Sequence, residues 1–456
     1  MSRRAAAEWQ SVTVRPGLSS TRQYMAIAAV LTAMMLVVLD AAMANVALPS
    51  IARSLQVSPA SSVLVVTSYQ MALLMALLPC AALGERWGYR RVFTAGVAIF
   101  TAASVLSALS STLTWLVTAR FLQGLGGAGV MALGVAMLRV VVPHRQLGTA
   151  IGWNALVVAL STAAGPTVGA FILSGADWHW LFALNVPIGL LALLATRALP
   201  QVYGTARPLD LGSVALNAGA FAAFVIGAEV LLTMPLVGGM LLTTSALSAV
   251  RLVRREMPKA APLVPIDLLR VGSFRMSVIA SICCFAGQTI AIIALPFYLY
   301  HGLGLSTLMT GFYLTTWPLM VALTAPVAAR AATRVPTAWL CAMGGTLLAI
   351  GLAAASLWPL HEDPLPLIGF TMLCGVGFGL FNVPNNHNLF LSVSSERSGA
   401  AGGMQGTARL LGQTAGAVTM ALLFNLVSAE TAPRIALGVG AVLAMMAGIV
   451  SLRRTA

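Results

Sequence analysis

The sequence predicts an all-α protein that crosses a membrane many times, and three observations support this prediction. Of the 456 residues, 59% are hydrophobic and only 8% are charged, with a mean hydropathy of +0.91, whereas a soluble domain has about 25% charged residues. Apolar runs recur along the whole chain, and about 20 apolar residues are enough to cross the hydrocarbon core of a bilayer. The basic residues gather in alternate loops, as they do in polytopic membrane proteins.

Fourteen apolar runs have the length of a transmembrane helix. They lie at about residues 25–48, 61–83, 92–111, 113–138, 147–173, 180–198, 211–232, 234–251, 276–299, 305–329, 336–359, 365–391, 399–427 and 432–451. The two weakest divisions are at 111–113 and 232–234, where short polar stretches and Pro235 supply the turns. We therefore expect fourteen transmembrane helices.

The loops predict how these helices are oriented in the membrane. Of the 26 basic residues, all but four fall in the N-terminal tail, at the C-terminus or in loops on one side, while Arg53 and Arg434 fall on the other. Basic loops stay in the cytoplasm, so both termini are expected there, which requires an even number of helices. We do not expect the tail to be a signal peptide, because the apolar run behind it is too long. The longest loop, 252–275, is basic and contains prolines, so we expect a cytoplasmic linker.

The composition also argues against several partners and chemistries. The net charge of +14 lies in loops on one side, so it indicates membrane orientation rather than a nucleic-acid partner. The five cysteines lie in apolar runs with no histidine cluster nearby, so no metal site is expected. No loop is long enough for a folded domain, which disfavours a membrane-bound enzyme or sensor.

Three charged residues lie inside the apolar runs and away from their ends, namely Asp40, Arg120 and Arg409. An unpaired carboxylate in the membrane is costly, so Asp40 needs a partner or a proton. At about 1.5 Å per residue, Asp40 lies roughly 13 Å and Arg120 roughly 10 Å below the same outer edge. We expect the two to pair, directly or through water or a polar neighbour. The pair either locks helices together or marks a transport pathway, and its intramembrane position favours the second.

Two short segments contain residues that suit moving parts. The loop LGERWGYRR at residues 83–91 places Glu85, Arg86 and Gly88 in a tight turn, and such a cluster can bind helix ends and act as a latch. The segment GPTVG at 165–169 has a proline that bends a helix and glycines that allow close approach. It is either a kinked packing seam or a pliable seal.

The second half has an unusual number of polar residues in its apolar runs. Asn382 and the segment 385–388 cannot all face one side of a helix, so this helix end either is bonded internally or contacts substrate. His387 is of the type that titrates near neutral pH, but a lone histidine near a helix end is expected to be structural. Glu229 lies near the outer end of its helix, where an interfacial position is expected. Trp317 and other aromatic residues suit the wall of a cavity for flat apolar cargo.

Five segments occur in one order at one spacing. They read LDAAMANVALP (39–49), ALGERWGYRR (82–91), RFLQGLGGAG (120–129), GPTVG (165–169) and WHWLFALNVPIG (178–189). Together they resemble the fourteen-helix drug:proton antiporter family of the major facilitator superfamily. One such motif alone is weak, but five in register are specific for the family, although they do not specify a substrate.

The resemblance implies two six-helix bundles, at residues 25–200 and 276–452, which rock around a central cavity. A cytoplasmic tail (1–24) precedes them, and two inserted helices (201–252) and a cytoplasmic linker (253–275) separate them. The resemblance also implies export of a small molecule across a lipid bilayer, with the proton gradient as energy source and no cofactor. A monomer in the inner (plasma) membrane of a bacterium is expected.

The resemblance further assigns roles to particular residues. Asp40 would bind the proton, with Arg120 as its coupling partner. The latch would consist of Glu85, Arg86, Gly88 and Arg90, and the antiporter motif of Gly165, Pro166 and Gly169. We expect a substrate cavity lined by Asn45, Gln123, Gln288, Trp317, Asn382, Asn385, Arg409 and Gln413.

The sequence departs from the family pattern at several positions. Glu85 stands where aspartate is usual, Ala81 replaces the first glycine of the latch, and Ala170 replaces the closing glycine of the antiporter motif. Ala42 stands where a threonine is common. The run at 399–427 has no acid, which speaks against divalent cations as cargo.

The leading hypothesis is therefore a proton-coupled antiporter that exports small amphipathic or cationic compounds (multidrug efflux) by alternating access. Asp40 would take a proton when open to the outside and lose it when open to the inside, where cargo or Arg120 stabilises the carboxylate. One alternative is a dedicated exporter or uniporter of a single metabolite in the same fold. The other is a membrane-embedded enzyme or sensor.

Overall fold

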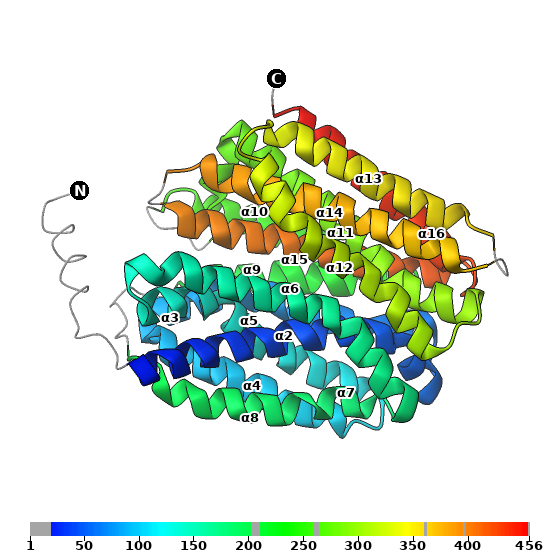
Figure 1. Cartoon of the computed structure of the whole chain (residues 1–456), viewed down its shortest axis with the longest axis horizontal. Helices are drawn as coiled ribbons and strands as arrows, with labels where there is room; N and C mark the ends of the chain where they lie inside the picture. The colour runs from blue at the N-terminus through cyan, green and yellow to red at the C-terminus, as the bar shows by residue number, and fades with distance from the viewer. Residues whose placement is uncertain (1–19, 202–209, 260–263, 360–362, 395–396, 455–456) are drawn as a thin grey trace, which may run out of the picture.

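The computed structural model describes residues 20–201, 210–259, 264–359, 363–394 and 397–454. Most of the predicted tail (1–24) and residues 260–263 of the predicted linker lie outside the described residues. Every regular element in the described ranges is helical (Figure 1). The predicted all-α fold class is confirmed.

The first half of the chain forms the N-terminal group of helices. It consists of α2 (Ser20–Ser54), α3 (Pro59–Trp87), α4 (Tyr89–Ala108), α5 (Leu113–Val141), α6 (His144–Gly175), α7 (His179–Ala183), α8 (Asn185–Ala195) and the 3₁₀ turn η1 (Thr196–Ala198). Hydroxyl side chains cap several helix starts: Ser58 accepts a hydrogen bond from the backbone of Ser61 at the start of α3, and Thr112 accepts one from Trp115 at the start of α5. The segments α7, α8 and η1 together make one span, His179–Ala198.

The second half of the chain contains an inserted hairpin, α9 and α10, followed by the C-terminal group, α11 to α16. The elements are α9 (Leu211–Val230), α10 (Pro235–Glu256), η2 (Ile266–Arg270), α11 (Gly272–Phe297), the π-helical turn η3 (Tyr298–Gly302), α12 (Thr307–Ala331), α13 (Thr337–Leu357), α14 (Leu365–Leu391), α15 (Ser398–Leu426) and α16 (Ala432–Leu452).

The fourteen predicted spans correspond to these helices. Thirteen helical segments in the described chain are long and apolar enough to cross a membrane. The remaining one, α15, has the length, but its glycines, its glutamines and Arg409 lower its hydropathy. The helices extend beyond the apolar runs: α2 continues through Pro49 to Ser54. Proline removes one backbone hydrogen bond of a helix, and Arg53 strengthens the turn that follows by donating to the carbonyl of Pro49 at 3.4 Å.

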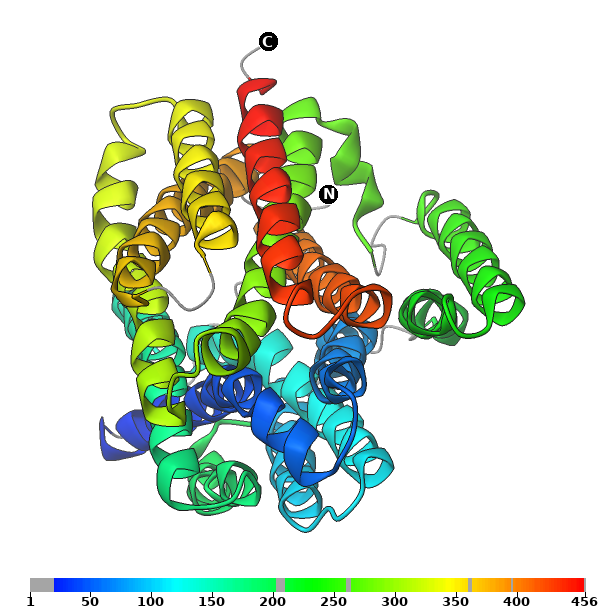
Figure 2. The same cartoon turned by 90° about the vertical axis from the view of Figure 1, so that its right-hand side faces the viewer.

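The two groups of helices lie against each other along a seam, with their axes roughly along the long axis of the molecule (Figures 1 and 2). The seam is defined here as the contacts of α6 with α12, of α3 with α15 and of α2 with α11. Successive helices are antiparallel. We call the end at which α2 begins and α16 ends the tail end, and the opposite end, at which α2 stops, the far end.

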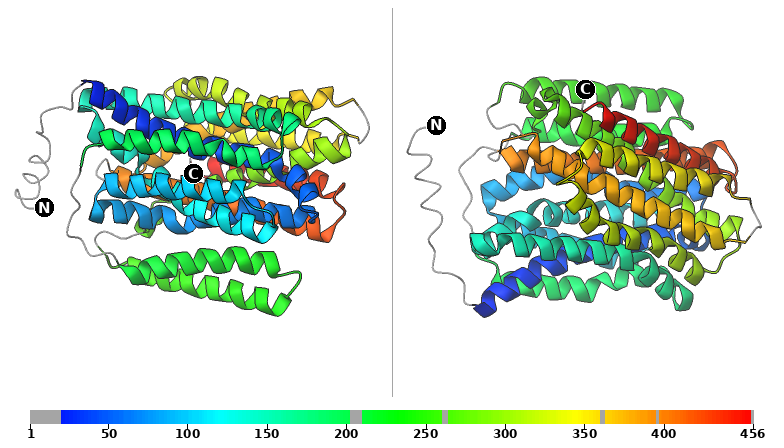
Figure 3. Two further views of the ribbon diagram at one scale, coloured as in Figure 1. Left: turned by 90° about the horizontal axis from the view of Figure 1, so that it is seen from below. Right: turned by 45° about the horizontal axis from the view of Figure 1, so that its top comes forward.

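The inserted hairpin stands beside the two groups rather than between them (Figures 2 and 3). Its helix α9 packs on α3, where Asn217 Nδ2 donates to the carbonyl of Met75 at 3.1 Å. It also contacts α15, through Val225 and Ala228 against Val418. The helix α10 packs on α9 and leaves most of its surface exposed, as expected of a helix that faces lipid.

The hydrophobic core shows which end of the seam is closed. In the far half of the N-terminal group, residues such as Met43 and Val66 belong to a cluster that continues through the C-terminal group to Tyr313 and Trp317. The tail half of the N-terminal group forms a separate cluster, to which the C-terminal group contributes Leu410 of α15. The seam is therefore closed at the far end, and toward the tail end the cores of the two groups are separate.

Candidate functional site

The structure brings Asp40 and Arg120 together inside the N-terminal group. Asp40 lies on α2, and Arg120 and Gln123 lie three residues apart on α5, so their side chains project from one face of that helix. Asn185, at the start of α8, and Ser104, on α4, complete the cluster. Each of the five side chains is at most 1% exposed.

The contacts in this charge cluster are short. Arg120 Nη1 lies 2.6 Å from Asp40 Oδ2 and also donates to Gln123 Oε1 at 2.5 Å. The other carboxylate oxygen, Oδ1, accepts from Gln123 Nε2 at 3.0 Å and from Asn185 Nδ2 at 2.6 Å. Gln123 Nε2 also donates to Ser104 Oγ at 2.9 Å. Gln123 thus accepts from the arginine through its oxygen and donates to the aspartate through its nitrogen.

The arrangement is that of an ionised carboxylate. All three groups bonded to Asp40 are donors, and one of them is the cation Arg120. A buried charge is tolerated when it is paired and its remaining hydrogen-bonding positions are filled. In this conformation Asp40 is satisfied by protein groups and shielded from solvent, so protonation requires the cluster to open.

Arg120 connects this cluster to the seam. Its Nε donates to the carbonyl of Val65 on α3 at 3.2 Å. Its guanidinium carbon lies 4.3 Å from the ring centre of Tyr69 on α3 and 5.4 Å from that of Phe182. The helix α3 is the one that contacts α15 of the C-terminal group. A movement of Arg120 would therefore change the contacts of α3 at the seam.

The sequence reasoning missed Asn185, Ser104 and Tyr69. A signal for Asn185 was present, because it is the polar residue within the apolar part of the segment WHWLFALNVPIG (178–189). Polar residues inside apolar runs are rare and need partners. The signals for Ser104 and Tyr69 were weaker, since serine and tyrosine are common in membrane helices.

The predicted latch lies at the tail end, between α3 and α4. Gly88 ends α3 with a φ of 95°, a conformation that side chains disfavour, and its N–H donates to the carbonyl of Gly84. Glu85 and Arg86 are exposed. Arg90 Nη2 donates to the carbonyl of Arg197 at 3.4 Å, which ties this turn to the end of the N-terminal group. The role of these residues as a latch stays a prediction.

The segment Gly165–Pro166–Gly169 lies on α6 and packs against α2. A Cβ on Gly165 would lie 2.3 Å from Ala42 Cβ, so glycine is needed for this approach, and Gly169 contacts Met43. The absence of a bulkier residue at position 42 suits this contact.

The other side of α6 faces α12 across the seam. A Cβ on Gly311 would lie 2.1 Å from Ala170 Cβ, and the hydroxyls of Thr167 and Thr315 are 2.5 Å apart. These contacts lie in the far half of both helices, where the core of the two groups is continuous. The segment is thus part of the closed end of the seam.

The residues predicted to line a substrate cavity are not gathered in one place. Gln123 belongs to the charge cluster. Asn385 donates to Ser281 Oγ at 2.7 Å and accepts from Arg454, inside the C-terminal group. Asn382 accepts from Asn386 on its own helix, at 3.2 Å.

The remaining predicted cavity residues differ in their surroundings. Asn45 donates to the carbonyl of Ala41 on its own helix at 2.8 Å. Trp317 is 3% exposed, and its Nε1 has no partner among the described residues. Gln288, Arg409 and Gln413 are half-buried. His387, for which a structural role was expected, is exposed.

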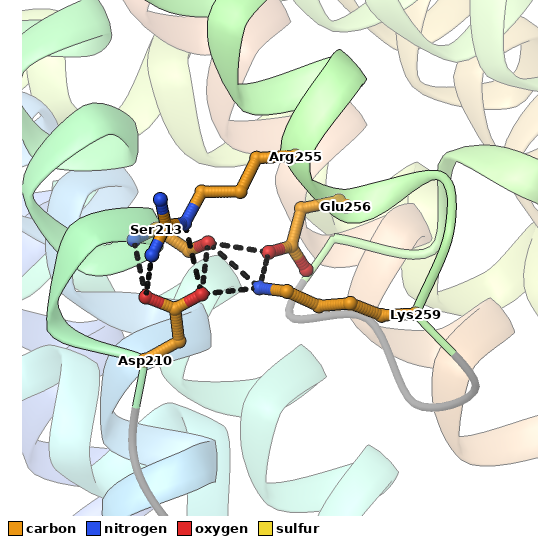
Figure 4. Close-up of polar contacts among 5 residues, drawn as sticks. All are labelled: Asp210, Ser213, Arg255, Glu256 and Lys259. Atoms are coloured by element: carbon orange, nitrogen blue, oxygen red, sulfur yellow. Dashed lines mark hydrogen bonds and ion pairs between the residues drawn. The ribbon is translucent and has the colours of Figure 1, made fainter.

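A second charge cluster, not foreseen from the sequence, joins the two ends of the inserted hairpin at the tail end (Figure 4). Asp210 caps α9 through Ser213 and is bonded by Arg255, at 3.0 Å, and by Lys259, at 2.5 Å. Lys259 also pairs with Glu256, which accepts from Ser213 at 2.5 Å. Arg255 and Lys259 hold the pKa of the Asp210 carboxyl well below its usual range. Carboxylates and cations alternate in this cluster, so it serves to fasten α9 to α10.

Glu229 near the far end of α9 does not face lipid alone. It lies close to Thr67 of α3, and its Oε1 is buried with no partner among the described residues. The described part of the chain contains no group of three or more histidine, cysteine, aspartate or glutamate side chains that could hold a metal ion.

The fold and the buried charge cluster define a polytopic membrane transport protein. The sequence matches the family model described as Major Facilitator Superfamily over residues 30–271 and 277–456, and the chain belongs to this superfamily. Its members are transporters, so the chain is not an enzyme. The resemblance seen in the five sequence segments is confirmed.

Three curated relatives illustrate the range of similar proteins. The chain is 42% identical over 445 residues to "Uncharacterized transporter YebQ" of Escherichia coli, covering 95% of this chain and 96% of the relative. It is 27% identical over 376 residues to "Riboflavin transporter RibZ" of Clostridioides difficile, covering 82% of each. It is 29% identical over 416 residues to "Tetracenomycin C resistance and export protein" of Streptomyces glaucescens, covering 88% of this chain and 76% of the relative.

Proposed function

We propose that the chain is a proton-coupled antiporter that exports small amphipathic compounds by alternating access. The observation that carries this proposal is the sealed cluster of Asp40, Arg120, Gln123 and Asn185 at mid-helix, next to a seam that is closed at one end. Ionisable residues inside a membrane are rare, and they commonly mark a proton or substrate pathway. The relative that is named for tetracenomycin C resistance and export supports export of drug-like compounds.

The geometry of the cluster supports a particular proton step. When the far end opens, a proton that reaches Asp40 removes its charge, and Arg120 loses the partner that holds it at 2.6 Å. Arg120 then interacts more strongly with Tyr69 and with the carbonyl of Val65, both on the seam helix α3. When the tail end opens, loss of the proton restores the ion pair. Cargo and proton are thus coupled through α3, since Asp40 faces the interior of its own group.

The membrane orientation completes the proposal. The tail end is cytoplasmic, because the basic residues of the described helix ends and loops, including Arg86 and Arg145, gather there. In this orientation the conformation described is closed toward the outside. The chain would lie in the inner membrane of a bacterium, and the turn around Gly88 would lie at the cytoplasmic end of the moving helices.

Proton flux in proteoliposomes tests this function. The purified chain is reconstituted with a pH-sensitive dye inside, and cationic, neutral and anionic amphipaths are added in turn. We expect at least one compound to cause proton movement in the wild type and in Asp177→Asn, which removes an exposed carboxylate, but not in Asp40→Asn. Compound-dependent proton movement that survives in Asp40→Asn contradicts the proposal.

The alternative of a dedicated transporter for one metabolite is favoured by a specific observation. A relative that covers 82% of this chain is named as a riboflavin transporter. Transport of a single compound from the panel, with no competition by the others, would assign the chain to this alternative.

A further inference from the structure

Among the residues that the structure describes, Arg409 is an intramembrane cation without a counter-charge. It lies near the middle of α15, its Nε is buried, and that atom has no hydrogen-bond partner among the described residues. None of the ion pairs in the described chain includes it. Since an arginine stays charged in proteins, its position needs an explanation.

The packing of α15 fixes the direction in which Arg409 projects. Gly406 faces α3, Gly412 faces α11, and Val418 faces the inserted helix α9. At 3.6 residues per turn, Arg409 and Gln413 fall between the side that faces α3 and the side that faces α11, and opposite the side that faces α9. They therefore project into the seam between the two groups.

The balance of charge at this depth is positive. Away from the ends of the spanning helices, the described chain has two cations, Arg120 and Arg409, and one acid, Asp40. Asp40 is already bonded by Arg120 and two amides. It cannot also neutralise Arg409 in this conformation.

A second unused donor lies on α3, the helix that α15 contacts across the seam. Tyr69 of α3 interacts electrostatically with Arg409, and its hydroxyl is buried with no hydrogen-bond partner among the residues that the structure describes. Tyr69 is 3% exposed, and its ring is the one on which Arg120 lies. The two side chains belong to helices that contact each other across the seam, and neither the Arg409 Nε nor the Tyr69 hydroxyl has an acceptor among the described residues.

We propose that Arg409 and the Tyr69 hydroxyl, with Gln413 one helical turn farther along α15, bind an anionic acceptor group of the cargo, a carboxylate or a phenolate. A guanidinium binds a planar carboxylate through two parallel hydrogen bonds, and such charge-assisted bonds are among the strong ones. The proposal rests on the transport function proposed above and narrows its substrate class from amphipaths in general to amphipathic anions. A simple lipophilic cation would be repelled by Arg409.

The site also links the binding of cargo to the protonation of Asp40. Tyr69 would contact the cargo through its hydroxyl and Arg120 through its ring, so binding at the seam and protonation of Asp40 act on the same side chain.

Binding of three probes on one fluorophore tests the proposal. They are a diethylaminocoumarin carboxylate, its neutral primary carboxamide and its cationic ammonioethyl amide. Binding is measured by fluorescence anisotropy with the full chain in phosphatidylcholine nanodiscs, with empty nanodiscs subtracted. We expect the carboxylate to bind at least about tenfold more tightly than the carboxamide, because its hydrogen bonds are charge-assisted. The cationic amide should bind least tightly of the three.

Variants assign this preference to the site. Arg409→Gln is expected to abolish it, while Arg330→Gln, which removes the same charge from the exposed end of α12, keeps it. If Arg409→Gln does not fold, Tyr69→Phe keeps the ring under Arg120 and is expected to weaken the carboxylate several-fold without changing the carboxamide. Equal affinities for the three probes, or no binding of the carboxylate, overturns the proposal. So does a preference that survives Arg409→Gln or, where that variant does not fold, one that survives Tyr69→Phe. Because no pH gradient is applied, the result stands or falls separately from proton coupling.

Discussion

The two halves of the buried ion pair should not be equally replaceable. Asp40→Asn leaves Arg120 buried at 1% exposure with no counter-charge, and breaking a buried pair in this way costs about 3–5 kcal/mol. An amide at position 40 also puts a donor toward either Arg120 or the two donors that now bind Oδ1, at 3.0 and 2.6 Å. The arginine cannot escape this cost, because it does not lose its proton in proteins.

Arg120→Gln is expected to be milder, because Asp40 can take up a proton and become neutral. The proton is taken from solvent, so this variant should gain stability relative to the wild type as the pH falls, whereas the deficit of Asp40→Asn should stay the same on the two sides of neutrality. The double variant Asp40→Asn/Arg120→Gln leaves no buried charge. Its destabilisation should therefore be smaller than the sum of the single effects, by about 2–3 kcal/mol.

Thermal unfolding in detergent, followed by tryptophan fluorescence on the acidic and alkaline sides of neutrality, measures these differences. The order of Tm on the acidic side should be wild type, then Arg120→Gln, then Asp40→Asn, with Arg330→Gln as the exposed control. A wild-type Tm for Asp40→Asn, or an Arg120→Gln variant that loses stability as the pH falls, would refute the reasoning.

Three further predictions concern the parts around this pair. Gly311→Ala places a Cβ 2.1 Å from Ala170 Cβ, so the far end of the seam should open, with a cost of about 1–3 kcal/mol. In a Thr315→Cys background, Gly311→Ala should speed up modification of the new cysteine by an impermeant maleimide. The control Gly152→Ala, where a Cβ meets nothing within 4 Å, should leave the modification rate unchanged. Because Arg255 holds the pKa of Asp210 low, the Asp210 pairs stabilise the fold above the usual titration range of aspartate and are lost as the pH falls; Asp210→Asn should lower Tm at neutral pH and have little effect in strong acid. Glu229→Gln keeps the size and polarity of the side chain beside Thr67 and should transport at the wild-type rate. A loss of proton-driven transport in that variant would show that Glu229 takes part.

The sequence predicted those features that are set by local chemistry and by the cost of charge in a membrane. The spans follow from apolar length, and the pairing of Asp40 with Arg120 follows from depth, because two opposite charges at one level lower each other's cost. The positions of the helix ends were predicted less accurately. Polar interfacial residues extend helices beyond their apolar runs, as α2 extends beyond Pro49.

Contacts between distant segments could not be read from the sequence. Asn185 reaches Asp40 across 145 positions, and this depends on how α8 packs on α2. Asn385 shows the same limit. A polar residue in an apolar run is compatible with a cavity wall and with an internal hydrogen-bond network, and the structure contains the second, with Ser281 and Arg454. The fastening of Asp210 to Lys259 joins the two ends of a hairpin, so no local pattern marks it.

The central claim, that Asp40 couples cargo to protons, is tested most directly by comparing counterflow with gradient-driven transport in one set of proteoliposomes. Counterflow of labelled against unlabelled cargo at equal pH reports alternating access alone, while accumulation under an imposed pH gradient also requires proton coupling. The account predicts that Asp40→Asn retains counterflow and loses accumulation, and that Asp177→Asn retains both. Accumulation in Asp40→Asn would contradict the claim, and loss of counterflow as well in a folded Asp40→Asn would reduce the ion pair to a structural contact.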